Sequence, residues 1–153
     1  MIYLGIDPGT VRIGYGLIED IGGKLRSLTW GILENPSGDP RATHKELSKL
    51  ILQWKPQSAA VEKLFFLNNK RSAMAVSEMR GVIMLSLAQH GLVVHEFTPP
   101  QVKQALCGHG RAEKHQMQKM IRMVLGISEE VRPDDAADAL ALALCCATAQ
   151  KRY

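Results

Sequence analysis

The sequence predicts a mixed α/β fold in which helices flank a five-stranded sheet. Three observations predict it. Turn residues divide the first third of the chain into three strand-like runs, two later apolar runs are separated by a segment of helix length, and the last third has helical patterns. The 153 residues suffice for one hydrophobic core, so we expect a single domain spanning residues 1–153.

The first three strands are predicted to form an antiparallel meander. They are Ile2–Asp7, Val11–Glu19 and Lys24–Leu33, and the turns between them contain Pro-Gly and Gly-Gly. A helix should follow the turn-rich NPSGDP and end at Lys55-Pro56, because apolar side chains there recur three or four residues apart.

The middle of the chain predicts a βαβ unit. Ser58–Val61 and Leu92–Phe97 resemble a buried parallel strand pair, and the segment between them predicts a helix at about Arg71–Gln89. Further helices are expected near Val102–Leu106 and Glu113–Leu125, and Pro133 should open the last one. These elements complete the mixed sheet and its helical layers.

Composition is that of a folded, water-soluble protein. Hydrophobic residues make up 46% of the chain and charged residues 22%. No apolar run approaches the roughly 18 residues that span a bilayer, and the first residues lack a secretory signal, so we expect a cytoplasmic protein without a membrane segment. Cys107, Cys145 and Cys146 have no metal-binding spacing and are expected to be reduced core residues.

Positive charge is concentrated in two segments. The formal net charge is +4. Between Lys103 and Arg122 there are five Lys or Arg residues against one acid, and between Lys63 and Arg80 there are four against one. Such segments are typical of proteins that contact nucleic-acid phosphates, although ordinary solvated lysines would give the same pattern.

Two carboxylates are expected where predicted strands end. Asp7 follows the apolar run at the start of the chain, and Glu62 follows SAAV. Taken singly, Asp7 is explained as a turn residue and Glu62 as a solvated acid. If the two strands are neighbours, however, the carboxylates lie close together and raise each other's pKa unless a cation lies between them.

A third group of acids opens the last helix, in PDDAADALALALCCA. Asp134 and Asp135 suit the positive end of the helix dipole. Asp138 is not explained in this way, because the helix around it is apolar, and we expect it to be a buried carboxylate with a partner or a metal. Asp135 and Asp134, three and four residues before Asp138, can each share its helix face, so geometry alone does not choose between them.

A cluster of carboxylates from these positions would suit hard cations such as Mg²⁺ or Mn²⁺. Two such ions about 3.5–4 Å apart can activate a water and stabilise the leaving oxygen of a phosphodiester. No nucleophilic side chain is needed for that chemistry.

The sequence resembles the RuvC family of Holliday junction resolvases, which have an RNase H-like fold. The resemblance covers nearly the whole chain and rests on LGIDPGTVRIGYG, VEKLFFLNN, Arg80-Gly81, QVKQALCGHGRAEKHQM and DAADALALAL. It implies an Mg²⁺-dependent endodeoxyribonuclease that nicks opposing strands of a four-way junction. The metal-binding and catalytic acids implied by the motifs are Asp7, Glu62, Asp135 and Asp138, with two Mg²⁺ ions, or Mn²⁺ in their place.

The same resemblance implies how DNA is bound. It places basic residues near the junction phosphates at Lys103 and Lys114 and a junction-probing aromatic at Phe65, and the basic loop GHGRAEK adds Arg111. It also implies a homodimer that works with a branch-migration helicase complex. A family-typical Gln is replaced by Lys63, and His109 lies between the loop glycines, which leaves the cleavage-site preference open.

Three other interpretations compete with this one. Asp-x-Gly-Thr on a first hairpin also resembles the phosphate loop of actin-like ATPases and sugar kinases, but 153 residues leave no room for their second domain. An RNase H-fold nuclease acting on other nucleic acid is the second. A non-catalytic junction-binding module is the third, and the intact acid set argues against it. We expect the helix from Arg71 onward to supply the dimer contact through Met74, Met79, Val82 and Ile83.

Overall fold

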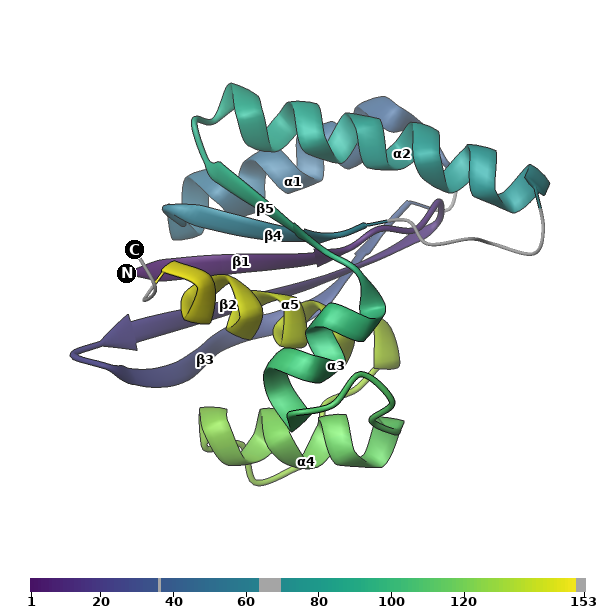
Figure 1. Cartoon of the computed structure of the whole chain (residues 1–153). Helices are drawn as coiled ribbons and strands as arrows, with labels where there is room; N and C mark the ends of the chain where they lie inside the picture. The colour runs from purple at the N-terminus through teal and green to yellow at the C-terminus, as the bar shows by residue number, and fades with distance from the viewer. Residues whose placement is uncertain (36, 64–69, 151–153) are drawn as a thin grey trace.

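The computed structural model describes residues 1–35, 37–63 and 70–150, in which helices cover both faces of a five-stranded sheet (Figure 1). The strands are β1 (Ile2–Asp7), β2 (Arg12–Ile21), β3 (Lys24–Glu34), β4 (Ser58–Glu62) and β5 (Val93–Phe97). The helices are α1 (Pro40–Trp54), α2 (Lys70–Gln89), α3 (Pro99–Cys107), α4 (Lys114–Leu125) and α5 (Asp134–Gln150). This order of elements is the predicted one.

The strands are arranged in the order β3-β2-β1-β4-β5. β1, β2 and β3 pair in antiparallel fashion, as the predicted meander requires, whereas β4 is parallel to both β1 and β5. β1 therefore lies at the centre of the sheet, where it joins the rest of the meander to the βαβ unit. Because β1 and β4 run in the same direction, their last residues meet at one edge of the sheet.

Each face of the sheet has its own hydrophobic core. On one face Leu4, Ile6 and Val61 pack with residues of α1 and α2, and on the other Tyr3 and Ala60 pack with residues of α3, α4 and α5. Figure 1 shows α1 and α2 on one side of the strands and the other three helices on the opposite side. Side chains alternate along a strand, so the residues that follow Ile6 and Val61 face α5.

The backbone of helix α5 packs directly against a glycine of the sheet. A Cβ atom on Gly5 of β1 would lie 1.8 Å from the backbone oxygen of Ala139, a distance that real atoms do not reach. The helix is also lined by small residues, and every residue from Ala139 to Ala147 is buried. This close approach brings the start of α5 to the edge where β1 and β4 end.

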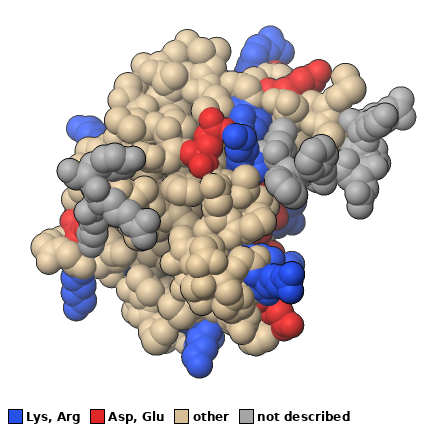
Figure 2. Space-filling view, in the orientation of Figure 1, with Lys and Arg blue, Asp and Glu red and all other residues tan. Residues whose placement is uncertain are grey.

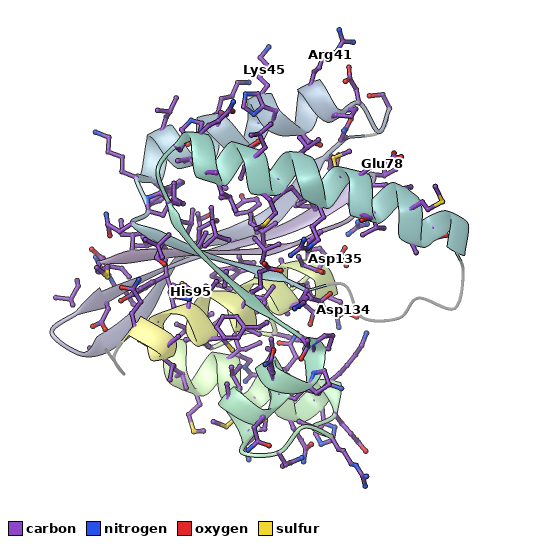
Figure 3. All side chains as sticks on the ribbon, turned by 45° about the horizontal axis from the view of Figure 1, so that its top comes forward. Arg41, Lys45, Glu78, His95, Asp134 and Asp135 are labelled. Carbon is purple, nitrogen blue, oxygen red and sulfur yellow. The ribbon has the colours of Figure 1, made fainter. Side chains whose placement is uncertain are left out.

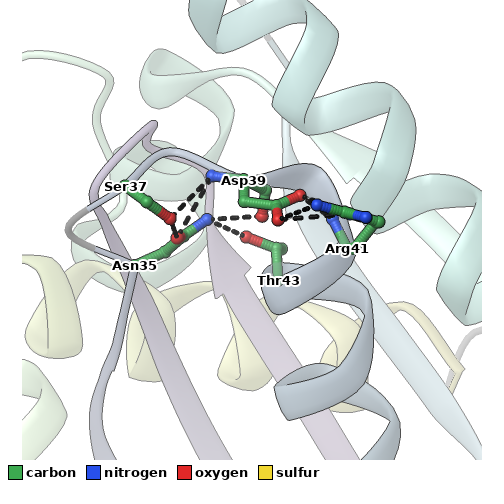
Figure 4. A network of polar contacts seen from close by, with 5 residues as sticks. All are labelled: Asn35, Ser37, Asp39, Arg41 and Thr43. Carbon is green, nitrogen blue, oxygen red and sulfur yellow. Dashed lines mark hydrogen bonds and ion pairs between the residues drawn. The ribbon is translucent and has the colours of Figure 1, made fainter.

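Helix starts differ from the sequence prediction by a few residues. α3 begins at Pro99 rather than Val102, because Thr98 and Gln101 form a capping box and prolines are tolerated in a first helical turn. α4 begins at Lys114, and Glu113 is its N-cap. α1 begins after the N-cap Asp39, whose side chain accepts a hydrogen bond from the Arg41 amide (Figure 4).

The loop before α1 is held by a buried amide. Asn35 is 3% exposed, and its Nδ2 donates to the Asp39 carbonyl at 2.8 Å and to Thr43 Oγ1 at 3.0 Å. Ser37 Oγ in turn donates to Asn35 Oδ1 (Figure 4). These contacts hold the N-cap Asp39 and the first turn of α1 in place, so a structural role at the helix start explains them.

Two expectations about side-chain location are corrected by the structure. Met79 and Ile83, expected at a dimer surface, are 3% and 0% exposed and pack in the core against the sheet. On α2 the large apolar side chains that face outward include Met74 and Leu85. Cys145 and Cys146 are buried as expected, but Cys107 is only half-buried.

Among the described residues, no helix combines the length and apolarity that a bilayer crossing requires.

Candidate active site

Asp7 and Glu62 meet at the edge of the sheet. Asp7 is the last residue of β1 and Glu62 the last of β4. The residues just before them, Ile6 and Val61, are directly paired in the parallel register. Because Ile6 and Val61 point into the core beneath α1 and α2, the two acids point to the opposite face, toward α5. The expected proximity of these strand-end carboxylates is therefore present.

The start of α5 contributes the other acids of the site. Asp134 and Asp135 lie in its first turn (Figure 3), and Asp138 follows one turn later. Gly14 of β2 is paired with Asp7 across the antiparallel ladder, and a Cβ atom on Gly14 would lie 2.1 Å from the backbone oxygen of Asp135. The missing side chain thus allows the first turn of α5 to rest beside the strand that carries Asp7.

The acids influence one another electrostatically. Burial raises the pKa of Asp7 to about 8, and the charges of Glu62, Asp138 and Asp135 add to that increase. Burial, with a smaller effect of Asp138, raises the pKa of Glu62 to about 7. A cation placed among these carboxylates would favour their ionised forms.

Asp138 is not a buried residue, contrary to the expectation from its apolar helix. It is the exposed position in the otherwise buried run Ala136–Ala147, because it faces the hollow between α5 and its neighbours. Nearby protein atoms still remove enough water to raise the pKa of Asp138, and the positive charges of Lys114 and Lys103 oppose that shift. Its exposure makes this carboxylate accessible from the pocket.

One arginine and one lysine pair with the acids at the helix start. Arg12 Nε lies 3.4 Å from Asp135 Oδ2. Lys114 Nζ donates to Asp134 Oδ2 at 2.8 Å, and this contact lowers the pKa of Asp134 and raises that of Lys114. Both pairs are largely exposed, so each contributes little to stability and can exchange its partners.

Arg12 was not singled out from the sequence. Its position in the predicted hairpin could have indicated it. The antiparallel pairing across the Pro8-Gly9 turn returns the chain beside the end of β1, and this brings Arg12 close to the acids. A cation at the start of β2 is therefore a natural partner for an acid at the end of β1 or on the helix above it.

The donor chemistry fits a hard divalent cation. All four candidate ligands are carboxylates, and two of them have pKa values raised to about 8 and about 7 by burial and mutual repulsion. In the described part of the chain no three Asp, Glu, His or Cys side chains converge closely enough to hold an ion as they stand. Asp135 is paired with Arg12, so a cation would have to replace that arginine as its partner.

A pocket of about 600 Å³ extends from these acids between α3, α4 and α5. Glu62 and Asp138 line it, together with the predicted DNA-binding residues Lys103 and Lys114. Lys119 and Arg122 of the same basic segment also line it. The pocket therefore joins the acidic edge to the strongest concentration of positive charge in the sequence.

The remaining predicted contact residues are placed as follows. Arg111 is exposed in the loop between α3 and α4, where it precedes the first turn of α4. On the face shown in Figure 2, Lys and Arg side chains are spread around the molecule, and some of them lie at the bottom and lower right, where α3 and α4 are found in Figure 1. Lys63 is exposed at the end of β4. Phe65 lies outside the described residues.

Comparison with known proteins gives one consistent result. The family model described as "Crossover junction endodeoxyribonuclease RuvC" matches residues 3–146. The protein of that description from Heliobacterium modesticaldum is 48% identical over 152 residues, which cover 96% of this chain and 94% of that protein. The one from Moorella thermoacetica is 47% identical over 153 residues, covering 97% and 92%.

A solved structure shows the same similarity in three dimensions. The structure of Thermus thermophilus RuvC in complex with Holliday junction substrate superposes with a TM-score of 0.93 at 32% sequence identity. The superposition covers 99% of this chain and 96% of that chain.

Proposed function

The chain belongs to the RuvC family of crossover junction endodeoxyribonucleases, and we propose that it resolves four-way DNA junctions by paired, Mg²⁺-dependent nicks in opposing strands. Family membership confirms the predicted RNase H-like fold and the predicted class of enzyme. One observation carries the mechanism: the strand-end acids Asp7 and Glu62 and the start of α5 meet beside a pocket lined by lysines.

Metal binding is assigned to Asp7, Glu62, Asp135 and Asp138. The family depends on a divalent metal, and an all-carboxylate set favours Mg²⁺, with Mn²⁺ as a substitute. Two ions per site would activate a water and stabilise the leaving oxygen of the phosphodiester. Burial and the charges of Glu62, Asp138 and Asp135 raise the pKa of Asp7 to about 8, and a bound cation would offset the repulsion among these carboxylates.

The protein residues contribute binding and orientation. Lys103 and Lys114 lie on the wall of the pocket that also contains Glu62 and Asp138, so a phosphate held by the lysines would lie next to the acids. Arg111, exposed before α4, extends this positive surface. The exchangeable Lys114–Asp134 pair allows Lys114 to turn to a phosphate at small cost. We assign the junction-probing role to Phe65.

Symmetric resolution requires two active sites related by a two-fold axis, and we therefore propose a homodimer. The exposed side chains Met74 and Leu85 of α2 are the apolar groups that this helix offers to a partner. Sedimentation at micromolar concentration tests this proposal: a monomer both alone and on junction DNA would contradict it. We also propose that the enzyme acts in the cytoplasm with a branch-migration helicase complex.

The activity is tested by incubating the protein with Mg²⁺ and a mobile four-way junction labelled on each strand in turn. We expect symmetric nicks in one pair of opposing strands, with ends that a ligase can seal. Linear duplex and RNA–DNA hybrid of the same sequence are the matched substrates and should remain intact. Cleavage of the hybrid at an equal or higher rate would instead indicate a nuclease for other nucleic acid, and binding without nicking would indicate a junction-binding module.

A further inference from the structure

The peptide group that follows Glu62 is held from two sides. The amide of Lys63 donates to the carbonyl of Phe97 in β5 at 2.8 Å. The carbonyl of Glu62 accepts a hydrogen bond from Arg80 Nε at 3.1 Å. Because N–H and C=O of a trans peptide point in opposite directions, these two bonds fix the plane of this peptide group.

Arg80 is itself fixed by a second contact. Its Nη2 donates to Glu96 Oε2, and its side chain is only 18% exposed. Glu96 lies in β5 directly beside Val61, the residue before Glu62. The guanidinium group therefore connects α2 with the ends of β4 and β5, and hydrogen bonds to a charged donor of this kind are stronger than neutral ones.

This contact occurs where the sheet gives the chain little further support. The parallel pairing of β4 with β1 ends at Ile6 and Val61, and its pairing with β5 ends at Glu62 and Phe97. Fixing the peptide plane after Glu62 fixes its backbone dihedral ψ and so restricts the direction of its side chain. That side chain lines the pocket that contains Asp138.

Arg80 acts from the face of the sheet opposite the acids. Helix α2 packs with Ile6 and Val61 on one face, whereas the carboxylates of Asp7 and Glu62 point to the α5 face. The contact of Arg80 with Glu62 is to the main chain, not to the carboxylate. This geometry therefore does not place the Arg80 side chain where it could contact a metal ion or DNA at the acids.

We propose that Arg80 is a positioning residue of this nuclease, which holds the backbone of Glu62 so that its carboxylate stays directed toward Asp138. The inference rests on the proposed function, in which Glu62 is a metal ligand. Through Arg80, helix α2 is directly connected to the active site. The same helix offers apolar side chains to a partner.

The test compares Arg80→Gln and Arg80→Lys with the unmodified protein. We expect single-turnover junction cleavage to fall on the order of 100-fold in Arg80→Gln, since misplacing a catalytic group by about 1 Å has that effect. Arg80→Lys keeps the charge beside Glu96 but not the planar fork that reaches both acceptors, so it should show a loss of the same kind. Junction affinity measured in EDTA should stay within about twofold for both, because Lys103 and Lys114 are unchanged.

A readout on the protein alone separates positioning from general damage. Calorimetric titration with Mn²⁺ should give a dissociation constant about tenfold higher for Arg80→Gln than for the unmodified protein. Arg26→Gln is the matched control, because Arg26 makes an ion pair of 2.6 Å with Glu19 across β2 and β3, far from the acids in the sheet order. It should leave both cleavage and Mn²⁺ affinity unchanged.

The outcomes are distinguishable. Normal cleavage and normal Mn²⁺ affinity in folded Arg80→Gln would overturn the inference, and so would a loss of junction affinity equal to the loss of rate, which would make Arg80 a DNA contact. If the unmodified protein binds Mn²⁺ but cuts no junction, the proposed function fails, whereas a changed Mn²⁺ affinity in Arg80→Gln still supports the role of Arg80.

Discussion

Gly14 and Asp135 meet backbone to backbone, so closely that a Cβ atom on the glycine would lie 2.1 Å from the Asp135 carbonyl oxygen. Gly14 is at the same time the ladder partner of Asp7. One position without a side chain therefore sets the distance between the end of β1 and the first turn of α5. This relationship makes the geometry of the acid cluster depend on a residue that carries no functional group.

Gly14→Ala should damage both the site and the fold. The added methyl group must push the backbone of Asp135 away, and overpacking of this kind costs about 1–3 kcal/mol of the free energy of unfolding. Junction cleavage should fall on the order of 100-fold because Asp135 moves relative to Asp7. Denaturant unfolding and single-turnover cleavage check the two effects.

Gly81→Ala is the matched control for that substitution. A Cβ atom on Gly81 would have nothing within 4 Å, and the residue is exposed in the interior of α2. Alanine should therefore raise the free energy of unfolding by about 0.5–1 kcal/mol through helix propensity and leave cleavage unchanged. Equal loss of activity in both alanine variants would show that the contact with Asp135 is not the cause.

Substitutions of the three acids at the start of α5 should have different effects on junction cleavage. Asp135→Asn and Asp138→Asn should each eliminate Mg²⁺-dependent junction cleavage, because each removes a proposed metal ligand. Asp134→Asn should cost only about 0.3–1 kcal/mol of stability, since its exposed carboxylate interacts with the helix dipole and with Lys114. Single-turnover rates decide the matter: an active Asp135→Asn beside an inactive Asp134→Asn would mean that the ligand assignment is shifted by one residue.

Without metal, the protein should lose stability as the pH rises. The folded-state pKa of Asp7 is raised from 3.8 to about 8, so its contribution is fully present below about pH 4 and is lost as the pH rises through 8. Between pH 6 and 8.5 in EDTA we expect the free energy of unfolding to fall on the order of 2 kcal/mol. Urea unfolding at the two pH values measures this difference.

Asp7→Asn provides the control for the pH effect. It removes the titrating group and the repulsion that Asp7 exerts on its neighbours, so its stability should change much less between pH 6 and 8.5. This variant should also be more stable than the unmodified protein at pH 8.5, bind junction DNA normally and fail to nick it. Parallel stability curves for the two proteins would assign the pH dependence to other groups.

Lys114 should contribute to DNA affinity through one phosphate. Lys114→Ala is expected to weaken junction binding and to reduce the slope of log affinity against log salt by about one unit. Lys49→Ala is a matched control on α1, where Lys49 makes a similar exposed ion pair of 2.7 Å with Glu46. An unchanged slope in Lys114→Ala, or an equal reduction in Lys49→Ala, would contradict the phosphate contact.

Much of this architecture follows from local sequence patterns. Turn residues and apolar runs placed the strands within two residues of their observed ends, since strand and turn preferences depend on neighbouring residues. The resemblance to the RuvC family predicted the four acids as a set, because each of them lies in one of the matching motifs. The ends of helices were predicted less well: capping at Thr98 extended α3 backward to Pro99, a contact between side chain and backbone that periodicity does not reveal.

Tertiary structure alone decided how the acids are surrounded. Helical periodicity could not distinguish Asp134 from Asp135, but packing against Gly14 brings Asp135 beside the strand of Asp7 and leaves Asp134 to Lys114. The exposure of Asp138 and the hydrogen bond from Arg80 to the Glu62 carbonyl likewise depend on elements that are distant in the chain. Local sequence determines which segments become strands and helices, whereas distances between segments depend on the packing of the whole fold, which no short pattern encodes.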